Sequence, residues 1–216
     1  LKKVLSKNIS NGKAMEAKAC DISNEKHIKH LADYIQDKWG HPDILINVAG
    51  ISPSRKSIEN FTPVEYDNII NINLRGCFML SQAIGRLMIA NRSGNIINID
   101  SLNTYAPLKG VGPYAISKAG IQMMTKSQAL EWGQYNIRVN SIAPGFFPTV
   151  LTGETWKKDY MVEWATNNTP LGKLGDLEDL IGAAVFLGSD ASQFITGQTI
   201  RVDGGISSGI AWPLKF

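Results

Sequence analysis

Short apolar runs alternate with longer helix-like segments along the chain, and this alternation constrains the fold more than any other feature of the sequence. The runs are typical of buried strands: residues 17–20, 44–47, 95–99, 137–142 and 199–202. Strands separated by helices in this way form a parallel sheet with helices on both faces. No internal repeat, linker or low-complexity tract divides the sequence, so we predict a single α/β domain spanning residues 1–216.

The segments between the runs carry helix start and stop signals. Ser23 is expected to cap a helix that reaches about Trp39. Thr62 and Glu65 form a capping box with proline at the first helical position, and the helix that they open is expected to end near Ala90. Two further helices are predicted at residues 114–132 and 176–187, the first of them stopped by a glycine and the second capped by an aspartate.

Composition excludes several classes of partner. At 216 residues, 44% of them hydrophobic and 19% charged, the chain can bury one substantial core. Its formal net charge is only +3, with lysines and arginines scattered among acidic residues, which argues against a nucleic-acid surface. No apolar stretch approaches the ~18 residues of a membrane span. We therefore expect a small-molecule substrate, with no nucleic-acid or membrane partner.

Cysteines and histidines do not predict a metal site. Cys20 and Cys77 lack CxxC spacing and are typical of reduced thiols in a cytoplasmic protein. His27 and His30 lie three residues apart on one predicted helix, but no further histidine or cysteine stands near them in the sequence. We interpret both histidines as surface residues.

Tyr114 and Lys118 carry the strongest chemical signal. They lie four residues apart, on one face of a predicted helix, where the ammonium can sit beside the phenol. A free phenol has a pKa near ~10, and a neighbouring positive charge favours the phenolate. Tyr114 could then exchange a proton with an alcohol or a carbonyl, while Ser101 donates a hydrogen bond to the substrate oxygen. The spacing alone is weak support, because it also occurs on exposed helix faces.

Five further motifs surround this pair in a fixed order: NVAG at 47–50, NLRG at 73–76, GNIINIDS at 94–101, RVNSIAPG at 138–145 and TGQTIRVDGG at 196–205. Together the motifs resemble the short-chain dehydrogenase/reductase family from about Asp21 to Gly205. The resemblance implies a Rossmann-type, doubly wound parallel sheet and NAD or NADP as cofactor. It also implies a catalytic tetrad, in which Asn73 orders a water that links the lysine to solvent: Asn73, Ser101, Tyr114 and Lys118.

One departure from the family is large. Its opening strand and glycine-rich turn, which hold the pyrophosphate, have no counterpart here, and residues 1–9 resemble the end of the family's third helix. We therefore expect about fifty N-terminal residues, with the first two strands, to lie outside this chain. The strand at 17–20 would then have no neighbour, and the strand at 44–47 would expose an unpaired apolar edge that favours aggregation and poor folding. The chain would be either a fragment or a protein that cannot bind dinucleotide in the usual way.

The resemblance also implies cofactor contacts. Asp21 and Ile22 would lie beside the adenine, and the Phe147 backbone and the Thr149 hydroxyl would hold the carboxamide. The full set of implied positions is Asp21, Ile22, Asn47, Ala49, Gly50, Tyr114, Lys118, Pro144, Gly145, Phe147 and Thr149. Two positions depart from the family's pattern. These are Val48 and Asp100, and the second could alter the electrostatics beside Ser101.

Substrate preference is suggested by the segments at 144–152, 163–164 and 169–175, which are similar to gluconate 5-dehydrogenases and related polyol or sugar-acid dehydrogenases. Residues 150–170 are expected to form a mobile lid, in which Trp156, Tyr160 and Trp164 either close over the substrate or only pack the lid helix. Arg55 could bind a substrate carboxylate. The predicted substrate contacts are Arg55, Asn103 and Trp156.

Two alternatives remain at this stage. One is a 3-oxoacyl carrier-protein reductase, which needs a basic surface near the entrance, and no obvious cluster supplies it. The other is a truncated, non-catalytic subunit or binding protein that keeps the tetrad without the phosphate site. In this family the helices that begin at Pro63 and Tyr114 commonly form a dimer seam, so we expect a homodimer or homotetramer.

Overall fold

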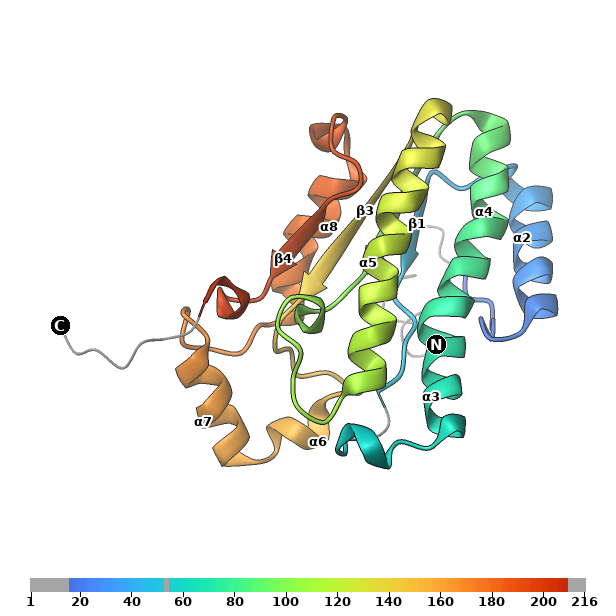
Figure 1. Cartoon of the computed structure of the whole chain (residues 1–216). Helices are drawn as coiled ribbons and strands as arrows, with labels where there is room; N and C mark the ends of the chain where they lie inside the picture. The colour runs from blue at the N-terminus through green and yellow to red at the C-terminus, as the bar shows by residue number, and fades with distance from the viewer. Residues whose placement is uncertain (1–15, 53–54, 210–216) are drawn as a thin grey trace.

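A four-stranded parallel sheet forms the centre of the computed structural model, which describes residues 16–52 and 55–209 (Figure 1). Neighbouring strands pair in sequence order, with Asn47 opposite Asn98 and Ile99 opposite Ile142. The order and direction confirm the predicted Rossmann-type α/β class. The strands are β1 (Ile44–Asn47), β2 (Gly94–Ile99), β3 (Ile137–Pro144) and β4 (Thr199–Val202).

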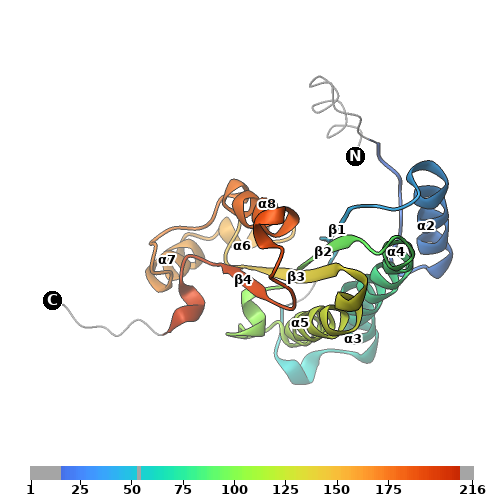
Figure 2. The ribbon, with the colours of Figure 1, turned by 90° about the horizontal axis from the view of Figure 1, so that it is seen from above.

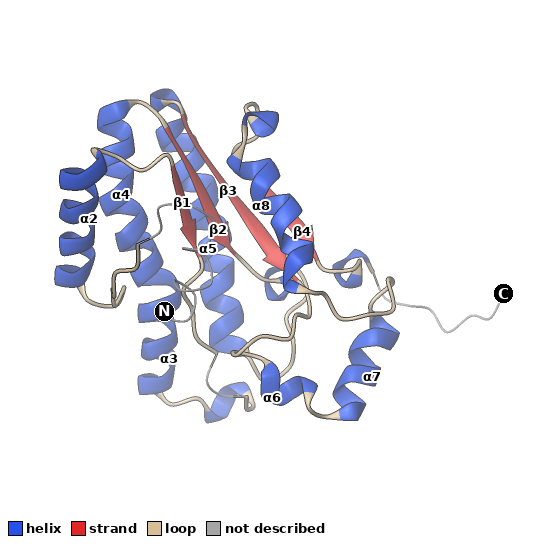
Figure 3. Ribbon diagram, turned by 180° about the vertical axis from the view of Figure 1, so that it is seen from behind, coloured by secondary structure: helices blue, strands red, loops and turns tan. Residues whose placement is uncertain are grey.

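Helices cover both faces of the sheet, as Figure 2 shows from above. Ile96 packs with Ile84 and Met88 on the face that carries α4 and α5, whereas Ile97 packs with Leu187 of α8 on the opposite face (Figure 3). Successive strand residues thus fill two separate apolar layers. The helices are α2 (Glu25–Trp39), α3 (Pro63–Ile70), α4 (Cys77–Asn91), α5 (Gly112–Trp132), α6 (Gly153–Trp156), α7 (Asp159–Asn168) and α8 (Ile181–Gly188).

Helix termini follow the predicted signals with one correction. The capping box of Thr62 and Glu65 is present at the start of α3. The cap of α2 is Asn24, whose side chain accepts from the Lys26 amide, and not Ser23, which hydrogen-bonds to Asp21 instead. Both residues are good caps, so the choice between neighbours depends on the backbone path into the helix.

A π-helical segment, Asn71–Gly76, joins α3 to α4, so the predicted long helix runs on to Asn91 with a widened turn in the middle. Such segments widen a helix locally and are frequent at functional sites. At the other predicted helices, α5 begins at Gly112 rather than Tyr114, and a 3-10 turn at Leu177–Leu180 precedes α8.

The predicted strand at 17–20 is wrong, because residues 16–21 have no regular secondary structure. A strand needs a hydrogen-bonding partner, and the expected neighbours are not among the described strands. The predicted apolar edge is confirmed: β1 pairs only with β2 in the described sheet, and Ile44, Ile46 and Val48 remain 44%, 47% and 65% exposed. The predicted helix end at residues 1–9 lies outside the described part of the chain.

Candidate active site

The carboxyl edge of the sheet collects most of the predicted site residues. Ser101 follows β2, Gly145 follows β3, and Gly50 lies just beyond β1. Because the strands are parallel, their carboxyl ends meet at one edge. There a cavity of about 150 Å³ opens, lined by the catalytic and substrate candidates Ser101, Asn103, Tyr114, Trp156 and Arg55 and by the cofactor candidate Phe147.

Lys118 is held beside Tyr114 in the buried part of the site. Its side chain is nearly buried, with 5% of the residue exposed, and its Nζ lies 5.8 Å from the centre of the Tyr114 ring. Nζ donates to the Ile99 carbonyl at the end of β2 (2.6 Å). Burial lowers the pKa of the Lys118 ammonium, whereas the Cys77 thiol and the Asp100 carboxyl act in the opposite direction. The predicted shared helix face is confirmed.

The Tyr114 phenol has a pKa above its ordinary value. Burial is the main cause, a hydrogen bond with Ser101 opposes it, and the Asp100 carboxyl raises the pKa further. The sequence-based expectation was a pKa lowered by Lys118, so the direction in the structure is the reverse. Desolvation of the phenolate outweighs the hydrogen bond that favours it. The Tyr114 phenol therefore carries its proton at neutral pH.

Asn73 lies in the π-helical segment and ties two parts of the site together. Its Nδ2 donates to the Ile51 carbonyl (2.9 Å) and to Ser117 Oγ (3.1 Å), and its Oδ1 accepts from the Ile51 amide (2.7 Å). Ser117 in turn donates to the Tyr114 carbonyl. Asn73 therefore connects the loop after β1 to α5, and its role in ordering a water stays a prediction.

Gly50 lies in close contact with this junction. A Cβ added there would lie 3.4 Å from Asn73 Oδ1 and 3.8 Å from Lys118 Nζ. The missing side chain leaves room beside the lysine ammonium.

Asp100 is the buried carboxyl of the site. Only 1% of the residue is exposed, and its Oδ1 accepts from Thr104 Oγ1 (2.6 Å). Burial raises the pKa of the Asp100 carboxyl to about 6, although Thr104, the Ser101 amide and Lys118 all act to lower it. The sequence pointed to this residue as a departure from the family's pattern, and its charge acts to raise the pKa of both Tyr114 and Lys118.

The predicted cofactor contacts differ in their exposure and in the hydrogen bonds that their side chains already make. Asn47 is buried and donates to Ser81 Oγ and Asn98 Oδ1 (both 2.8 Å), so its amide already supports the sheet. Asp21 is exposed, and hydrogen bonds from Ser23 lower the pKa of its carboxyl. The Ile22 backbone lies close to the π-helical segment, because a Cβ added at Gly76 would lie 2.7 Å from the Ile22 carbonyl oxygen.

The loop after β3 folds back on itself. The Phe147 carbonyl accepts from Thr152 Oγ1 (2.6 Å) and from Trp156 Nε1 (3.2 Å), and Thr149 Oγ1 lies 3.0 Å from Thr152 Oγ1. These contacts fix the loop and anchor α6 beside the cavity. Gly145 accepts no side chain, since a Cβ there would lie 2.6 Å from Asp203 Cα. The same loop begins at Pro144, the last residue of β3.

The three lid aromatics divide into two roles. Trp156 lines the cavity and also packs on Phe146, with ring centres 5.4 Å apart. Trp164 packs on the same phenylalanine, with ring centres 5.7 Å apart, and Tyr160 is 64% exposed. The lid therefore offers Trp156 to the cavity, while Trp164 packs on the loop after β3.

Two cavity residues were missed by sequence analysis. Lys109 lines the cavity together with Arg55, and no aspartate or glutamate is among the described residues that line it. Thr155 also lines it, and its Oγ1 is buried without a hydrogen-bond partner in the described part of the chain. No local pattern distinguishes either residue from other lysines and threonines in the sequence.

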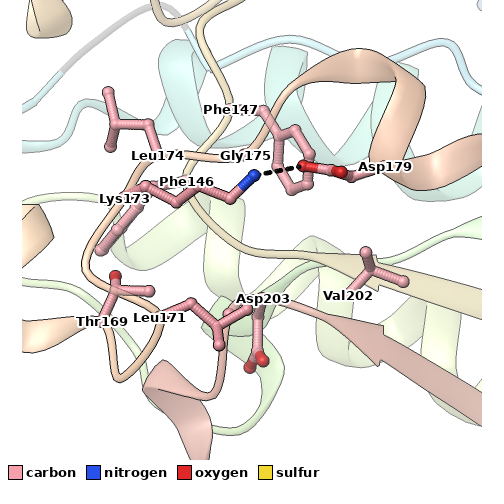
Figure 4. A pocket seen from close by; sticks show the side chains of 11 residues that line it. Phe146, Phe147, Thr169, Leu171, Lys173, Leu174, Gly175, Asp179, Val202 and Asp203 are labelled. Atoms are coloured by element: carbon pink, nitrogen blue, oxygen red, sulfur yellow. Dashed lines mark ion pairs between the residues drawn. The ribbon is translucent and has the colours of Figure 1, made fainter.

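A second cavity, of about 220 Å³, lies beside Phe146 and Phe147 (Figure 4). Lys173 and Asp179 form an ion pair there, with Nζ 3.6 Å from the carboxylate oxygen. Although it is larger than the cavity beside Tyr114, no member of the predicted tetrad lines it. We therefore place the candidate chemistry in the first cavity.

The described residues include no group of three or more histidine, cysteine, aspartate or glutamate side chains that could hold a metal ion. His27 and His30 are exposed on α2, and Cys20 and Cys77 are free thiols. Within the same residues, no helix has both the length and the apolar character needed to cross a membrane.

Comparison with known proteins places this chain among oxidoreductases. A family model described as "Enoyl-(Acyl carrier protein) reductase" matches residues 2–207. Gluconate 5-dehydrogenase of Gluconobacter oxydans is 36% identical over 187 residues, covering 87% of this chain and 73% of that protein. A 3-oxoacyl-[acyl-carrier-protein] reductase of Thermotoga maritima is 37% identical over 186 residues, covering 86% and 74%. The crystal structure of a Burkholderia cenocepacia gluconate 5-dehydrogenase, in complex with NADP and tartrate, superposes with a TM-score of 0.92 at 34% identity, covering 96% of this chain and 81% of that chain.

Proposed function

The chain belongs to the short-chain dehydrogenase/reductase family, a family of NAD(P)-dependent oxidoreductases, and from that premise we propose that it interconverts a secondary alcohol and a ketone on a small sugar acid. One observation carries this proposal: Ser101 and Tyr114 line one small cavity, directly beside the buried Lys118. A hydrogen-bond donor, a phenol and an ammonium are the groups that proton exchange at a carbonyl requires.

Each residue has a distinct part in the proposed reaction. Ser101 hydrogen-bonds to Tyr114 and can donate to the substrate oxygen. Tyr114, protonated at neutral pH, gives its proton to the carbonyl oxygen in reduction and takes one from the alcohol in oxidation. The Lys118 ammonium favours the phenolate that develops when the proton leaves. When bound, the nicotinamide supplies or accepts the hydride.

The site has groups that fit a nicotinamide cofactor, either NAD or NADP. One N–H of Lys118 is used by the Ile99 carbonyl, so further donors on Nζ remain to bind ribose hydroxyls. Beside this ammonium, Gly50 leaves space that a side chain would fill. We assign the remaining contacts to the positions that the family resemblance implies: Asp21, Ile22, Ala49, Gly145, Phe147 and Thr149. Asn47 would act indirectly, by supporting the end of β1.

A sugar acid fits the charge and the polar groups of the cavity. Arg55 and Lys109 offer two cations, and neither is in an ion pair among the described residues. Thr155 Oγ1 is a buried polar atom that still lacks a partner, which a substrate hydroxyl would supply. Asn103 is held by Ser101 Oγ and by the Leu108 amide, so it would position the serine. The relative of known structure carries tartrate, a hydroxy acid, which agrees with this class.

A carrier-protein reductase is the runner-up, since a 3-oxoacyl reductase shows similar identity. The small cavity with two cations favours a compact anion over a long acyl chain.

The experiment that tests the proposal is a screen of sugar acids and uncharged polyols with NAD and with NADP. Tyr114→Phe should lower the turnover at least about 100-fold, because it removes the proton carrier without changing the ring. Near-full turnover in this variant would overturn the mechanism. Arg55→Ala and Lys109→Ala should each raise KM for carboxylates about tenfold and spare polyols, whereas equal effects on both substrate classes would refute the carboxylate role.

A cytoplasmic homodimer or homotetramer is part of the same proposal. Phe78 of α4 and Ile116, Met123 and Leu130 of α5 are 46%, 47%, 61% and 85% exposed. Large apolar side chains on neighbouring helices favour burial against a second copy. The free thiols of Cys20 and Cys77 agree with a reducing compartment.

A further inference from the structure

Ser101 accepts two hydrogen bonds from one neighbour, Asn103. The Asn103 backbone nitrogen and its side-chain Nδ2 each lie 3.2 Å from Ser101 Oγ. The first bond is an ordinary cap of the short turn η4 (Leu102–Thr104), which Ser101 precedes. The second comes from a side chain that is 8% exposed and lines the cavity. Helix capping does not require this second bond, so it calls for another explanation.

The other end of the Asn103 side chain fixes the orientation of its amide group. The Leu108 backbone N–H donates to Asn103 Oδ1 (2.9 Å). Because an N–H needs an acceptor, the atom that faces Leu108 must be the amide oxygen. The atom that faces Ser101 is then the amide nitrogen, which can only donate. The direction of the second bond, from Asn103 to Ser101, therefore follows from the hydrogen-bond network.

The two bonds limit what the Ser101 hydroxyl can do in the cavity. A hydroxyl group has one proton to donate and two lone pairs that accept. Asn103 occupies both lone pairs, so the O–H is the hydrogen-bonding function that Ser101 can turn toward a substrate. The bonds that the oxygen receives also polarise the O–H and make it a better donor. A substrate hydroxyl cannot donate to this oxygen, which leaves its proton to Tyr114 in the same cavity.

We propose that Asn103 is a positioning residue that makes Ser101 a donor only, so that the substrate oxygen exchanges its proton with Tyr114 alone. Negative charge that develops on this oxygen then meets a donor that is already oriented. The inference rests on the proposed interconversion of alcohol and ketone, but not on the sugar-acid class, since any secondary alcohol would meet the same serine.

Two substitutions separate the polarity of Asn103 from its shape. Asn103→Asp keeps the shape and the acceptor for the Leu108 amide, but its carboxylate draws the Ser101 proton away from the substrate. Asn103→Ala removes the side chain and leaves one lone pair of Ser101 free. With any secondary alcohol that the protein oxidises, kcat at pH 8 should fall at least about 30-fold in Asn103→Asp and about fivefold in Asn103→Ala. The reverse order would show that Asn103 acts through shape, and would overturn the proposal.

Ser101→Ala provides the matched background for both variants. It removes the oxygen that accepts both Asn103 bonds, so each Asn103 substitution should lower kcat less than about twofold further. Losses as large as in the parent would also overturn the proposal. The comparison with Asn103→Ala decides by itself if Asn103→Asp does not fold.

Urea denaturation provides a readout that needs no substrate. Ser101→Ala and Asn103→Ala remove the same side-chain bond, so the double variant should lose less unfolding free energy than the sum of the two single losses. Additive losses would refute the coupling between the two residues. A protein that keeps this coupling but oxidises no secondary alcohol would instead overturn the proposed function, and with it the role of Ser101 as a donor to substrate.

Discussion

Stability should depend on pH through Asp100. Its pKa is raised from 3.8 to about 6 in the folded protein, so the folded state binds this proton more tightly than the unfolded chain does. Well below pH 4 the carboxyl is protonated in both states and does not change the free energy of unfolding. As the pH rises through about 6, its ionisation destabilises the folded state. Since only 1% of the residue is exposed, solvent screening does not reduce the effect much.

The magnitude follows from the two pKa values. The cost is about 1.6 kcal/mol at pH 5 and about 3 kcal/mol at pH 8, a difference of about 1.4 kcal/mol. Asp100→Asn removes this contribution and keeps the shape of the side chain. The free energy of unfolding of the variant minus that of the parent should therefore be about 1.4 kcal/mol larger at pH 8 than at pH 5.

The assay is urea denaturation of both proteins at the two pH values, with the unfolding free energy taken from linear extrapolation. Asp37→Asn is the matched control, because it removes one negative charge from the exposed end of α2. A difference between parent and Asp100→Asn that stays the same at pH 5 and pH 8 would refute the argument that burial raises the Asp100 pKa.

Three further variants test the fold around the site. Thr62→Ala should lose about 1 kcal/mol of stability in urea denaturation, because it removes the α3 capping box, whereas Thr62→Ser should lose little; equal losses would contradict the capping role. Ile46→Lys should reduce self-association measured by light scattering, since it places a charge on the exposed β1 edge; unchanged association would exclude that edge as the contact. Gly76→Ala should lower the free energy of unfolding by about 1–3 kcal/mol, because the added Cβ would lie 2.7 Å from the Ile22 carbonyl oxygen. Gly182→Ala is the control, because a Cβ added there meets no atom within 4 Å. An equal loss in both variants would mean that close packing at residue 76 is not the cause.

Local signals accounted for most of the secondary structure. The four strands that the structure contains were each predicted to within two residues, because a buried parallel strand shows itself as a short apolar run. The capping box at Thr62 and the end of α5 at Trp132 were also predicted, since caps depend on residues only a few positions apart. The predicted strand at 17–20 was wrong because an apolar run shows only that a segment can form a strand, whereas strand formation also requires a partner elsewhere in the chain.

The site shows the same division. The sequence by itself determined which groups can carry the chemistry, since the spacing of Tyr114 and Lys118 on a helix and the position of Ser101 after a strand are local properties. Only the tertiary structure decided their protonation, because a pKa depends on burial and on charges far away in the sequence. It reversed the expected shift at Tyr114, buried Asp100 at the end of β2, and brought Lys109 and Thr155 into the cavity.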